Sequence, residues 1–382
     1  MPAPDLLDVL LAGGRRADNA THIAHLPARE GVHADWPAWA DPALVAGYRA
    51  LGVERPWRHQ VEAADAAWHG QHTALGTSTG SGKSLAFWLP ALTSVRADSL
   101  AAAAGTAAFS RIENVRSRGS VLYLCPTKAL AADQLSGVER LLRAADVRDL
   151  RVATCDGDTP FTERRWVQDH ADAVLTNPDF LHFSMLPSHA RWVRFLRSLR
   201  YVVVDEGHAF RGVFGAHVSL VLRRLERLCQ HYSGGPGPVF LVASATTAEP
   251  ARSAARLVGV DERDVVTVTE NTAPSGTRTF VLWEPPELPP ADSGVDGFQV
   301  VAPSGVGADG ATTGTDEWWV DAPEAEDRPR RSATAEAADL LADLTCAGAR
   351  SLAFTRSRRG AESVALSAQR ALNAVDPALQ HA

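Results

Sequence analysis

Lysine is scarce in this sequence. Among its 38 lysine and arginine residues, only Lys83 and Lys128 are lysines, and all the others are arginines. A compact ammonium fits between phosphate oxygens where a broad, planar guanidinium does not. Because one of the two lysines lies in the Gly-Lys-Ser sequence at residues 82–84, chance is a poor explanation of its position, and a phosphate-binding role is predicted for Lys83.

Cysteine and long apolar runs are scarce too, and this excludes several classes of protein. No C-x-x-C spacing connects the four cysteines, so neither a zinc site nor a disulfide framework is expected. No apolar run reaches the roughly 18 residues of a membrane span, and the N-terminus, with Asp5 and Asp8, lacks the basic start of a secretion signal. These absences predict a protein of the reducing cytoplasm without a membrane partner. The cysteines are Cys125, Cys155, Cys229 and Cys346.

Basic residues are missing from one long stretch. Residues 279–327 contain no lysine or arginine but eleven aspartates and glutamates, and they are rich in proline and glycine. This composition predicts a flexible acidic insertion at about 285–330. The net charge of the whole chain is −7, which is smaller in magnitude than the eleven negative charges of this stretch. The rest of the chain is therefore mildly basic, which is compatible with a nucleic-acid partner.

Short apolar runs alternate with helical segments along the chain. Near-continuous apolar strands that alternate with helices predict an α/β fold, in which a parallel sheet carries helices on both faces. Each expected strand is followed by a polar cluster. Since ligands bind at the carboxyl ends of parallel strands, the clusters are expected to form one site. The strands are expected at residues 73–75, 121–125, 151–154, 173–175, 201–204 and 239–242.

The first polar cluster fits a phosphate-binding loop. Residues 77–84 match the pattern G-x-x-x-x-G-K-[ST], except that Thr77 replaces the first glycine. In such a loop, backbone N–H groups converge on phosphate oxygens, Lys83 reaches the β- and γ-phosphates, and the Ser84 hydroxyl binds Mg²⁺. The alternative is a Ser/Gly-rich turn before an apolar helix. The predicted nucleotide-binding residues are Gln60, Thr79, Gly80, Ser81, Gly82, Lys83 and Ser84.

An acidic cluster supplies groups that ATP hydrolysis needs. Asp205 and Glu206 follow the apolar run at 201–204, as in a Walker B strand, and solvated loop acids are the alternative. Asp205 would hold Mg²⁺, and Glu206 would orient and deprotonate the attacking water. His208 would lie at a domain interface and sense the state of the nucleotide. The predicted catalytic residues are Lys83, Asp205, Glu206 and His208, and the predicted cofactors are ATP and Mg²⁺.

Taken in order, these clusters resemble the motifs of a superfamily 2 DExH-box helicase. Within that superfamily, the sequences at 78–85, 156–160 and 214–218 are similar to the YprA-like, mitomycin-repair group of DNA helicases. Gly207 departs from the usual alanine or bulkier residue. The matching set is Gln60, the loop at 79–84, Pro-Thr-Lys-Ala-Leu at 126–130, Thr-Asn-Pro-Asp at 176–179, Asp-Glu-Gly-His at 205–208 and Ser-Ala-Thr at 244–246.

The resemblance implies a RecA-like fold and ATP-driven movement, 3′ to 5′, on single-stranded or partly duplex DNA, with a role in DNA repair. It also implies that Gln60 reads the adenine edge. By the same resemblance, a second group of residues would contact the phosphodiester backbone or couple hydrolysis to movement. The backbone contacts are Thr127, Lys128 and Asn177, and the coupling residues are Ser244 and Thr246. Arg356 and Arg358 would touch the strand or form a solvated basic face.

The expected organisation has three parts. Residues 1–50 form an extension, 51–275 a first RecA-like ATP-binding domain, and 276–382 the start of a second RecA-like domain, with a strand at 350–356. Neither an arginine motif like Q-x-x-G-R-x-G-R nor the family's four-cysteine zinc region follows, so a partial helicase that hydrolyses ATP weakly is expected. The alternatives are an RNA helicase and a nucleotide-dependent nucleic-acid-binding module. A small-molecule P-loop kinase would have no use for residues 126–128 and 244–246.

Overall fold

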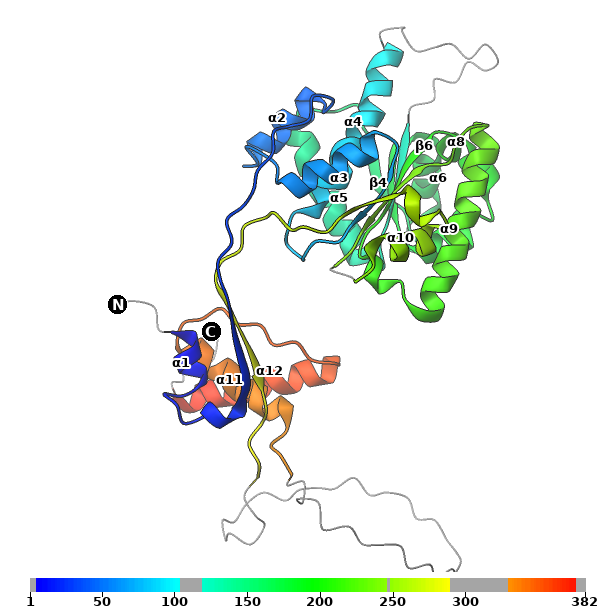
Figure 1. Ribbon diagram of the computed structural model, residues 1–382. Helices are drawn as coiled ribbons and strands as arrows, with labels where there is room; N and C mark the ends of the chain where they lie inside the picture. The colour runs from blue at the N-terminus through cyan, green and yellow to red at the C-terminus, as the bar shows by residue number, and fades with distance from the viewer. Residues whose placement is uncertain (1–4, 104–118, 246–247, 289–328, 376–382) are drawn as a thin grey trace, which may run out of the picture. The chain divides into compact units, whose positions relative to one another are not determined.

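The computed structural model describes residues 5–103, 119–245, 248–288 and 329–375, with the side chains of 98–103 left out (Figure 1). The chain divides into two compact units: a large unit, Ala28–Gly276, and a small unit that combines Met1–Pro27 with Thr277–Ala382. Residues 1–27 and 28–50, which the sequence grouped as one extension, therefore fall in different units. Most of the expected acidic insertion, and Thr246, lie outside the described residues.

A seven-stranded parallel sheet forms the centre of the large unit. The strands are β2 (His72–Leu75), β3 (Ser120–Leu124), β4 (Val152–Thr154), β5 (Ala173–Thr176), β6 (Leu199–Val204), β7 (Val239–Ala243) and β8 (Val265–Val268). Their order in the sheet is β4-β5-β3-β6-β7-β2-β8. Every residue of β3 and β5 is buried, as expected for strands that are covered on both faces. The predicted α/β fold is confirmed, although the sequence analysis missed the edge strand β8.

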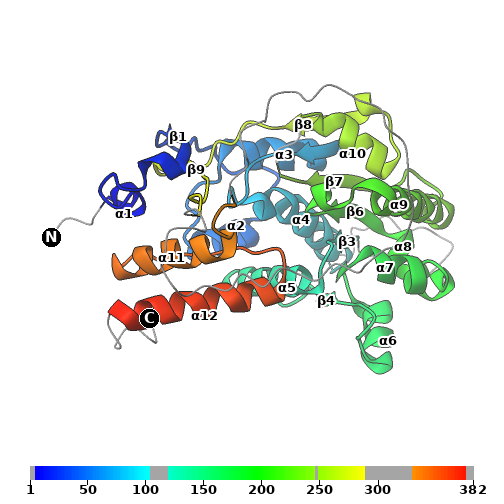
Figure 2. The same cartoon turned by 90° about the horizontal axis from the view of Figure 1, so that it is seen from below.

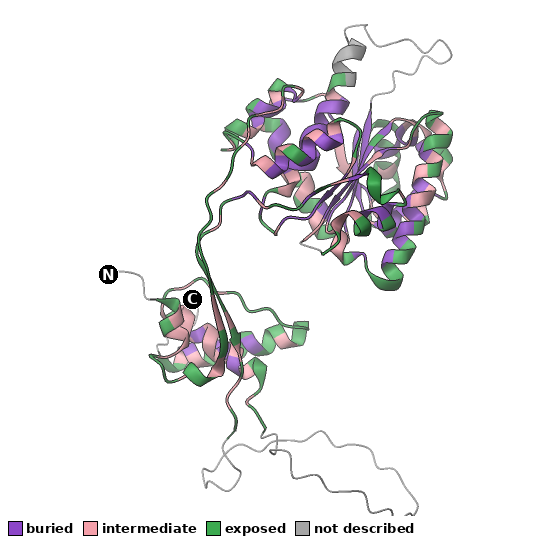
Figure 3. Cartoon of the chain, in the orientation of Figure 1, coloured by how far each residue is buried: buried purple, intermediate pink, exposed green. Residues whose placement is uncertain are grey.

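Helices cover both faces of this sheet (Figures 1 and 3). Helices α2 to α5 and one face of the sheet form one apolar cluster, which includes Phe87 of α4 and Tyr123 of β3. Helices α6 to α10 and the other face form a second cluster, which includes Trp192 of η3 and Phe240 of β7. The helices are α2 (Pro42–Ala50), α3 (Arg58–Trp68), α4 (Lys83–Ala103), α5 (Lys128–Ala144), α6 (Phe161–His170), α7 (Pro178–Phe180), α8 (Val193–Arg197), α9 (Gly212–Ser233) and α10 (Pro250–Val258), with short 3₁₀ or π segments η2 (Leu181–Met185), η3 (His189–Trp192), η4 (Gly207–Ala209) and η5 (Glu262–Asp264).

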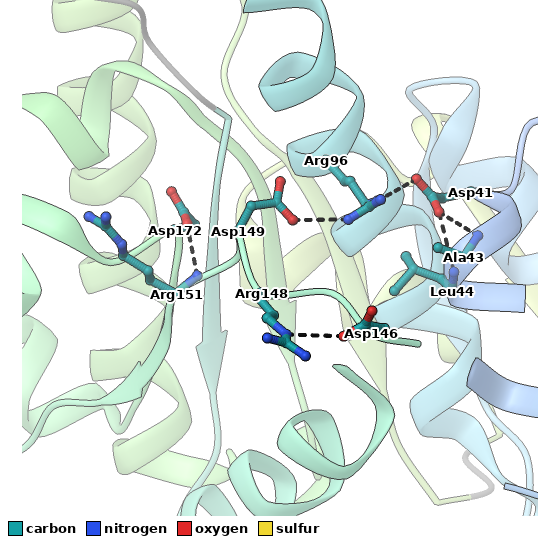
Figure 4. Close-up of polar contacts among 9 residues, drawn as sticks. All are labelled: Asp41, Ala43, Leu44, Arg96, Asp146, Arg148, Asp149, Arg151 and Asp172. Atoms are coloured by element: carbon teal, nitrogen blue, oxygen red, sulfur yellow. Dashed lines mark hydrogen bonds and ion pairs between the residues drawn. The ribbon is translucent and has the colours of Figure 1, made fainter. Parts of the chain in front are cut away.

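A buried ion pair holds α2 on the large unit. The Asp41 carboxylate caps the helix, because it accepts hydrogen bonds from the N–H groups of Ala43 at 2.8 Å and Leu44 at 3.2 Å. The same carboxylate pairs with Arg96 of α4 at 2.7 Å, and Arg96 also reaches Asp149 at 2.9 Å (Figure 4). One arginine thus connects α4 to α2 and to the segment after α5.

The small unit contains a two-stranded antiparallel sheet and a helical pair. Its elements are α1 (Leu6–Leu10), η1 (Ala17–Asn19), β1 (Ala20–Leu26), β9 (Arg278–Trp283), α11 (Ala333–Cys346) and α12 (Arg358–Val375). Strands β1 and β9 pair with each other. The buried Glu336 carboxylate on α11 accepts hydrogen bonds from the Trp283 indole at 3.0 Å and from Arg331 at 2.9 Å. The bond from Trp283 connects α11 to β9.

The strand expected at 350–356 does not form. Residues 351–355 have no strand partner in the part of the chain that the structure describes, and Leu352 and Phe354 are 86% and 92% exposed. Apolar alternation gives a segment only a local preference, whereas a strand needs a neighbour to pair with. None of the helices in the described ranges is long and apolar enough to cross a lipid bilayer.

Candidate nucleotide and nucleic-acid site

The residues after β2 form a turn around the Lys83 ammonium. Gly80 and Gly82 have φ angles of 77° and 76°, in the left-handed region that glycine enters without a steric penalty. Lys83 Nζ donates hydrogen bonds to the carbonyl oxygens of Thr77 and Ser78, both at 3.1 Å. The ammonium therefore lies inside the predicted phosphate loop, at the start of α4.

The tip of this loop is open and its base is packed. Thr79 and Gly80 are exposed, whereas Thr77 and Ser81 are buried, with their hydroxyls 2.8 Å apart. This hydrogen bond gives Thr77 a structural function at the position where the sequence pattern has glycine. Ser84 lies half-buried in the first turn of α4.

Asp205 and Glu206 act on the same lysine. Burial lowers the pKa of Lys83, and the negative charges of Glu206 and Asp205 oppose that shift. Lys83 follows β2 and the two acids follow β6, with β7 between these strands. The structure thus brings these three predicted residues together at the carboxyl edge of the sheet.

Three hydrogen bonds fix Asp205 at the end of β6. Its N–H donates to Leu124 O at 2.8 Å, and its carboxylate accepts from the Tyr123 hydroxyl at 2.7 Å and from the Glu206 N–H at 2.8 Å. Burial and the charge of Asp205 raise the pKa of Tyr123 far above its usual range, so this hydroxyl remains a donor. Sequence reasoning missed Tyr123, whose only signal is a hydroxyl within an otherwise apolar strand.

Glu206 has a strained backbone. Its φ of 52° and ψ of 41° place it in the left-handed region, which costs a residue with a Cβ about 1 kcal/mol or more. Strain of this kind is concentrated at functional sites, where the surrounding structure imposes it. Here Glu206 lies between the buried Asp205 and the short helix η4, and both fix its backbone.

His208 connects Glu206 with the end of β7. Its Nδ1 lies 3.2 Å from Glu206 Oε2 and 3.3 Å from the Ala245 nitrogen. Nδ1 accepts from the Ala245 N–H when it carries no proton and donates to Glu206 when it carries one, so the two partners compete for one nitrogen. Next to Ala245, the buried Ser244 hydroxyl has no hydrogen-bond partner in the described ranges.

Gln60 uses both polar atoms of its amide within the protein. Oε1 accepts from the Trp57 N–H at 2.8 Å, and Nε2 donates to Gly82 O at 2.7 Å. A cavity of about 620 Å³ opens beside it, between the α2–α3 connection, α4 and α5, and its lining includes Tyr48 and Trp88. In this arrangement Gln60 positions the phosphate loop, and the reading of adenine remains a prediction.

His59, which the sequence analysis did not single out, lies fully buried under the phosphate loop. Its Nε2 is 3.1 Å from Ser81 O, an acceptor, so Nε2 carries the proton. Nδ1 therefore accepts, from the Thr272 hydroxyl at 2.8 Å and the Thr272 N–H at 3.3 Å. Burial, together with the charges of Lys83 and Arg29, lowers the pKa of His59, and the bond to Ser81 opposes this shift. The ring is thus neutral.

Two of the predicted nucleic-acid contacts are helix caps. Thr127 Oγ1 accepts from the Leu130 N–H at 3.3 Å at the start of α5, and Asn177 Oδ1 accepts from the Phe180 N–H at 2.9 Å at the start of α7. In both residues the cap uses the acceptor atom. The donor groups, a hydroxyl and an amide NH₂, have no partner in the described part of the chain.

The third predicted contact, Lys128, is paired with acids. Its ammonium bonds to Asp158 and lies 3.8 Å from Asp156 Oδ1, and the hydrogen bond to Asp158 raises the pKa of Lys128. Both acids belong to the turn after β4. Arg356 and Arg358 are exposed residues of the small unit, so their contact with a nucleic-acid strand stays a prediction.

The parallel sheet, the glycine-rich loop after β2 and the Asp-Glu pair after β6 define a RecA-like, phosphate-loop nucleotide-binding protein. The sequence profile of the DEAD/DEAH box helicases matches residues 57–254, more than half of the chain, and this chain belongs to that family.

Similar proteins fall within the same class. The chain is 35% identical over 280 residues to an uncharacterized ATP-dependent helicase, YprA, of Bacillus subtilis, with 73% of this chain and 34% of that protein covered. It is 34% identical over 244 residues to the ATP-dependent helicase hrq1 of Schizosaccharomyces pombe, with 64% and 21% covered. The crystal structure of the DUF1998 helicase MrfA bound to DNA and AMPPNP has a TM-score of 0.75 and 30% identity, with 96% of this chain and 43% of that chain covered. This chain therefore spans less than half of each of these relatives.

Proposed function

We propose that this chain is the ATP-binding part of an ATP-dependent DNA helicase that moves 3′ to 5′ on single-stranded DNA and serves DNA repair. The observation that carries the proposal is the placement of the Lys83 ammonium in a glycine-rich loop, with Asp205 and Glu206 acting on its charge. Membership of the DEAD/DEAH box family and the similarity to named ATP-dependent helicases support it.

Each residue of the site has a role in this proposal. Lys83 neutralises charge on the β- and γ-phosphates, and Glu206 orients and deprotonates the attacking water. His208, which has Glu206 and Ala245 as competing partners, transmits the state of the site to the segment that carries Ser244. The uncommitted Ser244 hydroxyl is free to form a new bond when that segment shifts.

The site fits a magnesium ion that arrives with the nucleotide. The described residues contain no cluster of three or more His, Cys, Asp or Glu that could hold a metal by itself. Magnesium commonly binds through one or two carboxylates and substrate phosphates, and here Ser84 and Asp205 would supply the protein oxygens. When bound, it would offset negative charge between the β- and γ-phosphates.

The nucleic-acid partner is proposed to be DNA. The donor groups of Thr127 and Asn177 lie at the carboxyl ends of the neighbouring strands β3 and β5, where they can meet successive phosphates of one strand. Such contacts do not read sequence. The choice of DNA over RNA is supported by the DNA-bound helicase MrfA, and RNA is the alternative. Competition between a DNA oligonucleotide and the RNA of the same sequence distinguishes the two.

A second candidate is a nucleotide-dependent binding module with little turnover. The small unit favours this second candidate. Its described strands form a two-stranded sheet, whereas a RecA-like domain has a large parallel sheet. A comparison of ATP affinity with steady-state hydrolysis, with and without single-stranded DNA, separates the two candidates. Brisk DNA-stimulated turnover by this chain would exclude the binding module.

The two lysines offer a matched test of the nucleotide site. We expect Lys83→Arg to weaken binding of a fluorescent ATP analogue at least about tenfold, because a guanidinium is too broad for the loop. Lys128→Arg makes the same chemical change outside the loop and should leave the affinity within about twofold, since Lys128 is paired with acids at the other site. Equal affinities for the two variants would contradict the proposal.

A further inference from the structure

A second surface pocket lies on the large unit, away from the phosphate loop. It has a volume of about 310 Å³ and is formed by α6, the η2 segment and η3. Figure 2 shows α6 at the end of the large unit next to β4. The residues that matter here are Phe161, Arg164, Arg165, Phe180, Phe183 and Arg191, which we call the aromatic–arginine pocket.

All the charged residues that line this pocket are basic. They are three arginines, and no acid is among the lining residues. Arg165 lies over the Phe161 ring, with its guanidinium carbon 5.7 Å from the ring centre. Neither Arg165 nor Arg191 forms an ion pair with any residue that the structure describes. Two positive charges therefore face solvent beside aromatic rings.

Two phenylalanines of the pocket are exposed. Phe161 at the start of α6 is 62% exposed, and Phe183 in η2 is 72% exposed. Both residues line the pocket, so their two rings lie in the same place on the surface. Exposed aromatic rings beside arginines are the arrangement with which proteins bind unpaired bases of a nucleic acid.

Arg164 makes the floor of the pocket rigid. Its guanidinium lies over the Phe180 ring at 5.1 Å and donates to the carbonyl oxygens of Asp156 at 3.2 Å and Thr159 at 3.3 Å. These bonds fix the turn after β4 to the ring below the pocket. A base that stacked in the pocket would meet a surface that is already in place, so little ordering would be needed on binding.

The pocket continues the proposed nucleic-acid tract. Asn177 accepts a hydrogen bond from the N–H of Phe180, whose buried ring lines the base of the pocket. The turn that Arg164 holds carries the two acids that pair with Lys128. Strands β3, β5 and β4 are neighbours in that order. Backbone contacts at the ends of β3 and β5 therefore lead along the sheet edge toward the pocket beside β4.

We propose that the aromatic–arginine pocket binds single-stranded nucleic acid beyond the phosphate contacts at Thr127 and Asn177. Bases stack on Phe161 and Phe183, and Arg165 and Arg191 meet the phosphates that flank them. This inference rests on the proposed function and adds a second kind of contact to it, in which bases stack on aromatic rings. An acidic protein segment would also meet the arginines, but the continuity with the caps on β3 and β5 favours a nucleic-acid strand.

The test measures binding of fluorescent oligothymidines of increasing length to the whole chain, by anisotropy at several salt concentrations. We expect Phe161→Ala combined with Phe183→Ala to weaken binding of the longer oligonucleotides about tenfold and to leave that of the shortest ones unchanged. Arg165→Gln combined with Arg191→Gln should reduce the slope of log affinity against log salt by about 1.4, because two phosphate contacts are lost.

Controls separate stacking from loss of folding. Trp166→Ala removes a partly exposed aromatic ring of the same helix that does not line the pocket, and it should bind as the original chain does. Oligonucleotides with 5-iodouracil should crosslink to Phe161 or Phe183, as located by mass spectrometry, and not to Trp166. Unchanged melting temperatures would show that the exposed positions tolerate substitution.

The outcomes also distinguish this inference from the proposed function. If the original chain binds oligonucleotides, and both double variants match it in affinity, length dependence and salt slope, the pocket inference is wrong while the helicase proposal stands. The pocket would then be a candidate for an acidic protein partner. If the original chain binds no oligonucleotide at any length, both proposals fall.

Discussion

At the scale of single residues, His59 holds the phosphate loop through one protonation state. Nε2 must donate to Ser81 O and Nδ1 must accept from Thr272, so a second proton on the ring would face the Thr272 N–H, which is itself a donor. Its pKa lies below the ordinary value of 6.5. The unfolded chain, whose histidine has the ordinary pKa, therefore takes up the proton first as the pH falls.

This linkage predicts a pH-dependent effect of His59→Gln. The contribution of the neutral ring is fully present above about pH 6.5 and is lost as the pH falls through the lower folded pKa. We expect the variant to lose about 1–2 kcal/mol of unfolding free energy near pH 7.5, and less near pH 5.5. Urea unfolding of the original chain and of the variant at each pH measures the difference in unfolding free energy. Other groups that titrate, such as His72, are present in both proteins, so their contributions cancel. A difference that is constant with pH would contradict the assignment.

A sequence motif indicates geometry where its residues are close together in the chain, and it does not reveal contacts with distant residues. Gly80, Gly82 and Lys83 lie within one loop, so their pattern indicates their geometry. His59 contacts a residue 213 positions away, and no pattern beside Gln60 points to that contact. The pairing of Lys128 with Asp158, 30 positions away, is not local either, and sequence alone left that lysine unpaired.

At the scale of elements, the Arg96 pair decides how firmly α2 is held. The Asp41 carboxylate is buried, so removal of Arg96 leaves its negative charge without a charged partner in an environment that excludes water. Substitution of both partners removes this penalty along with the attraction. The pair is therefore expected to show strong coupling, in contrast to the exposed ion pairs of the chain.

A double-mutant cycle tests this expectation. Arg96→Met should cost about 2–4 kcal/mol of unfolding free energy, and Asp41→Asn, which keeps a side-chain acceptor for the cap, should cost less. The double variant should be more stable than the sum of the two losses predicts, by about 1 kcal/mol or more. Urea unfolding measures each value. Additive losses would show that the pair contributes no coupling.

The central strands of the sheet carry the clearest sequence signal. The runs at 121–124 in β3, 173–175 in β5 and 201–204 in β6 are buried and almost entirely apolar, because both faces of the central strands are covered, and the sequence analysis found them. β8 lies at the sheet edge, with two of its four residues buried, and it was missed. The segment at 350–356 was predicted as a strand, but it has no strand to pair with in the described ranges. A local sequence pattern does not show whether a partner strand is present.

At the scale of the whole molecule, the large unit holds its own ends together. The Arg29 N–H donates to Ser275 O at 2.8 Å, and the Ser275 N–H donates to Arg29 O at 2.9 Å. The two segments that leave this unit therefore start side by side. All residues of the proposed nucleotide site belong to this one unit.

We accordingly expect a fragment of residues 28–276 to fold alone and to bind nucleotide. It should unfold in one cooperative transition, and its affinity for a fluorescent ATP analogue should lie within about twofold of that of the whole chain, because the fragment contains every residue assigned to the nucleotide site. Lys83→Arg in the fragment serves as the non-binding control. Aggregation of the fragment, or binding more than about tenfold weaker, would show that the small unit is needed.

The division of the small unit has a consequence for biosynthesis. Thr21 of β1 bonds to Leu282 of β9, 261 positions later in the chain. At about 5–20 residues per second, a ribosome needs on the order of tens of seconds to deliver β9 after β1 has emerged. During that interval β1 has no partner strand, and an unpaired strand is prone to aggregation. If the large unit folds before β1 pairs with β9, its contact between Arg29 and Ser275 brings the two strands close together in the chain, so a much shorter loop remains to be closed.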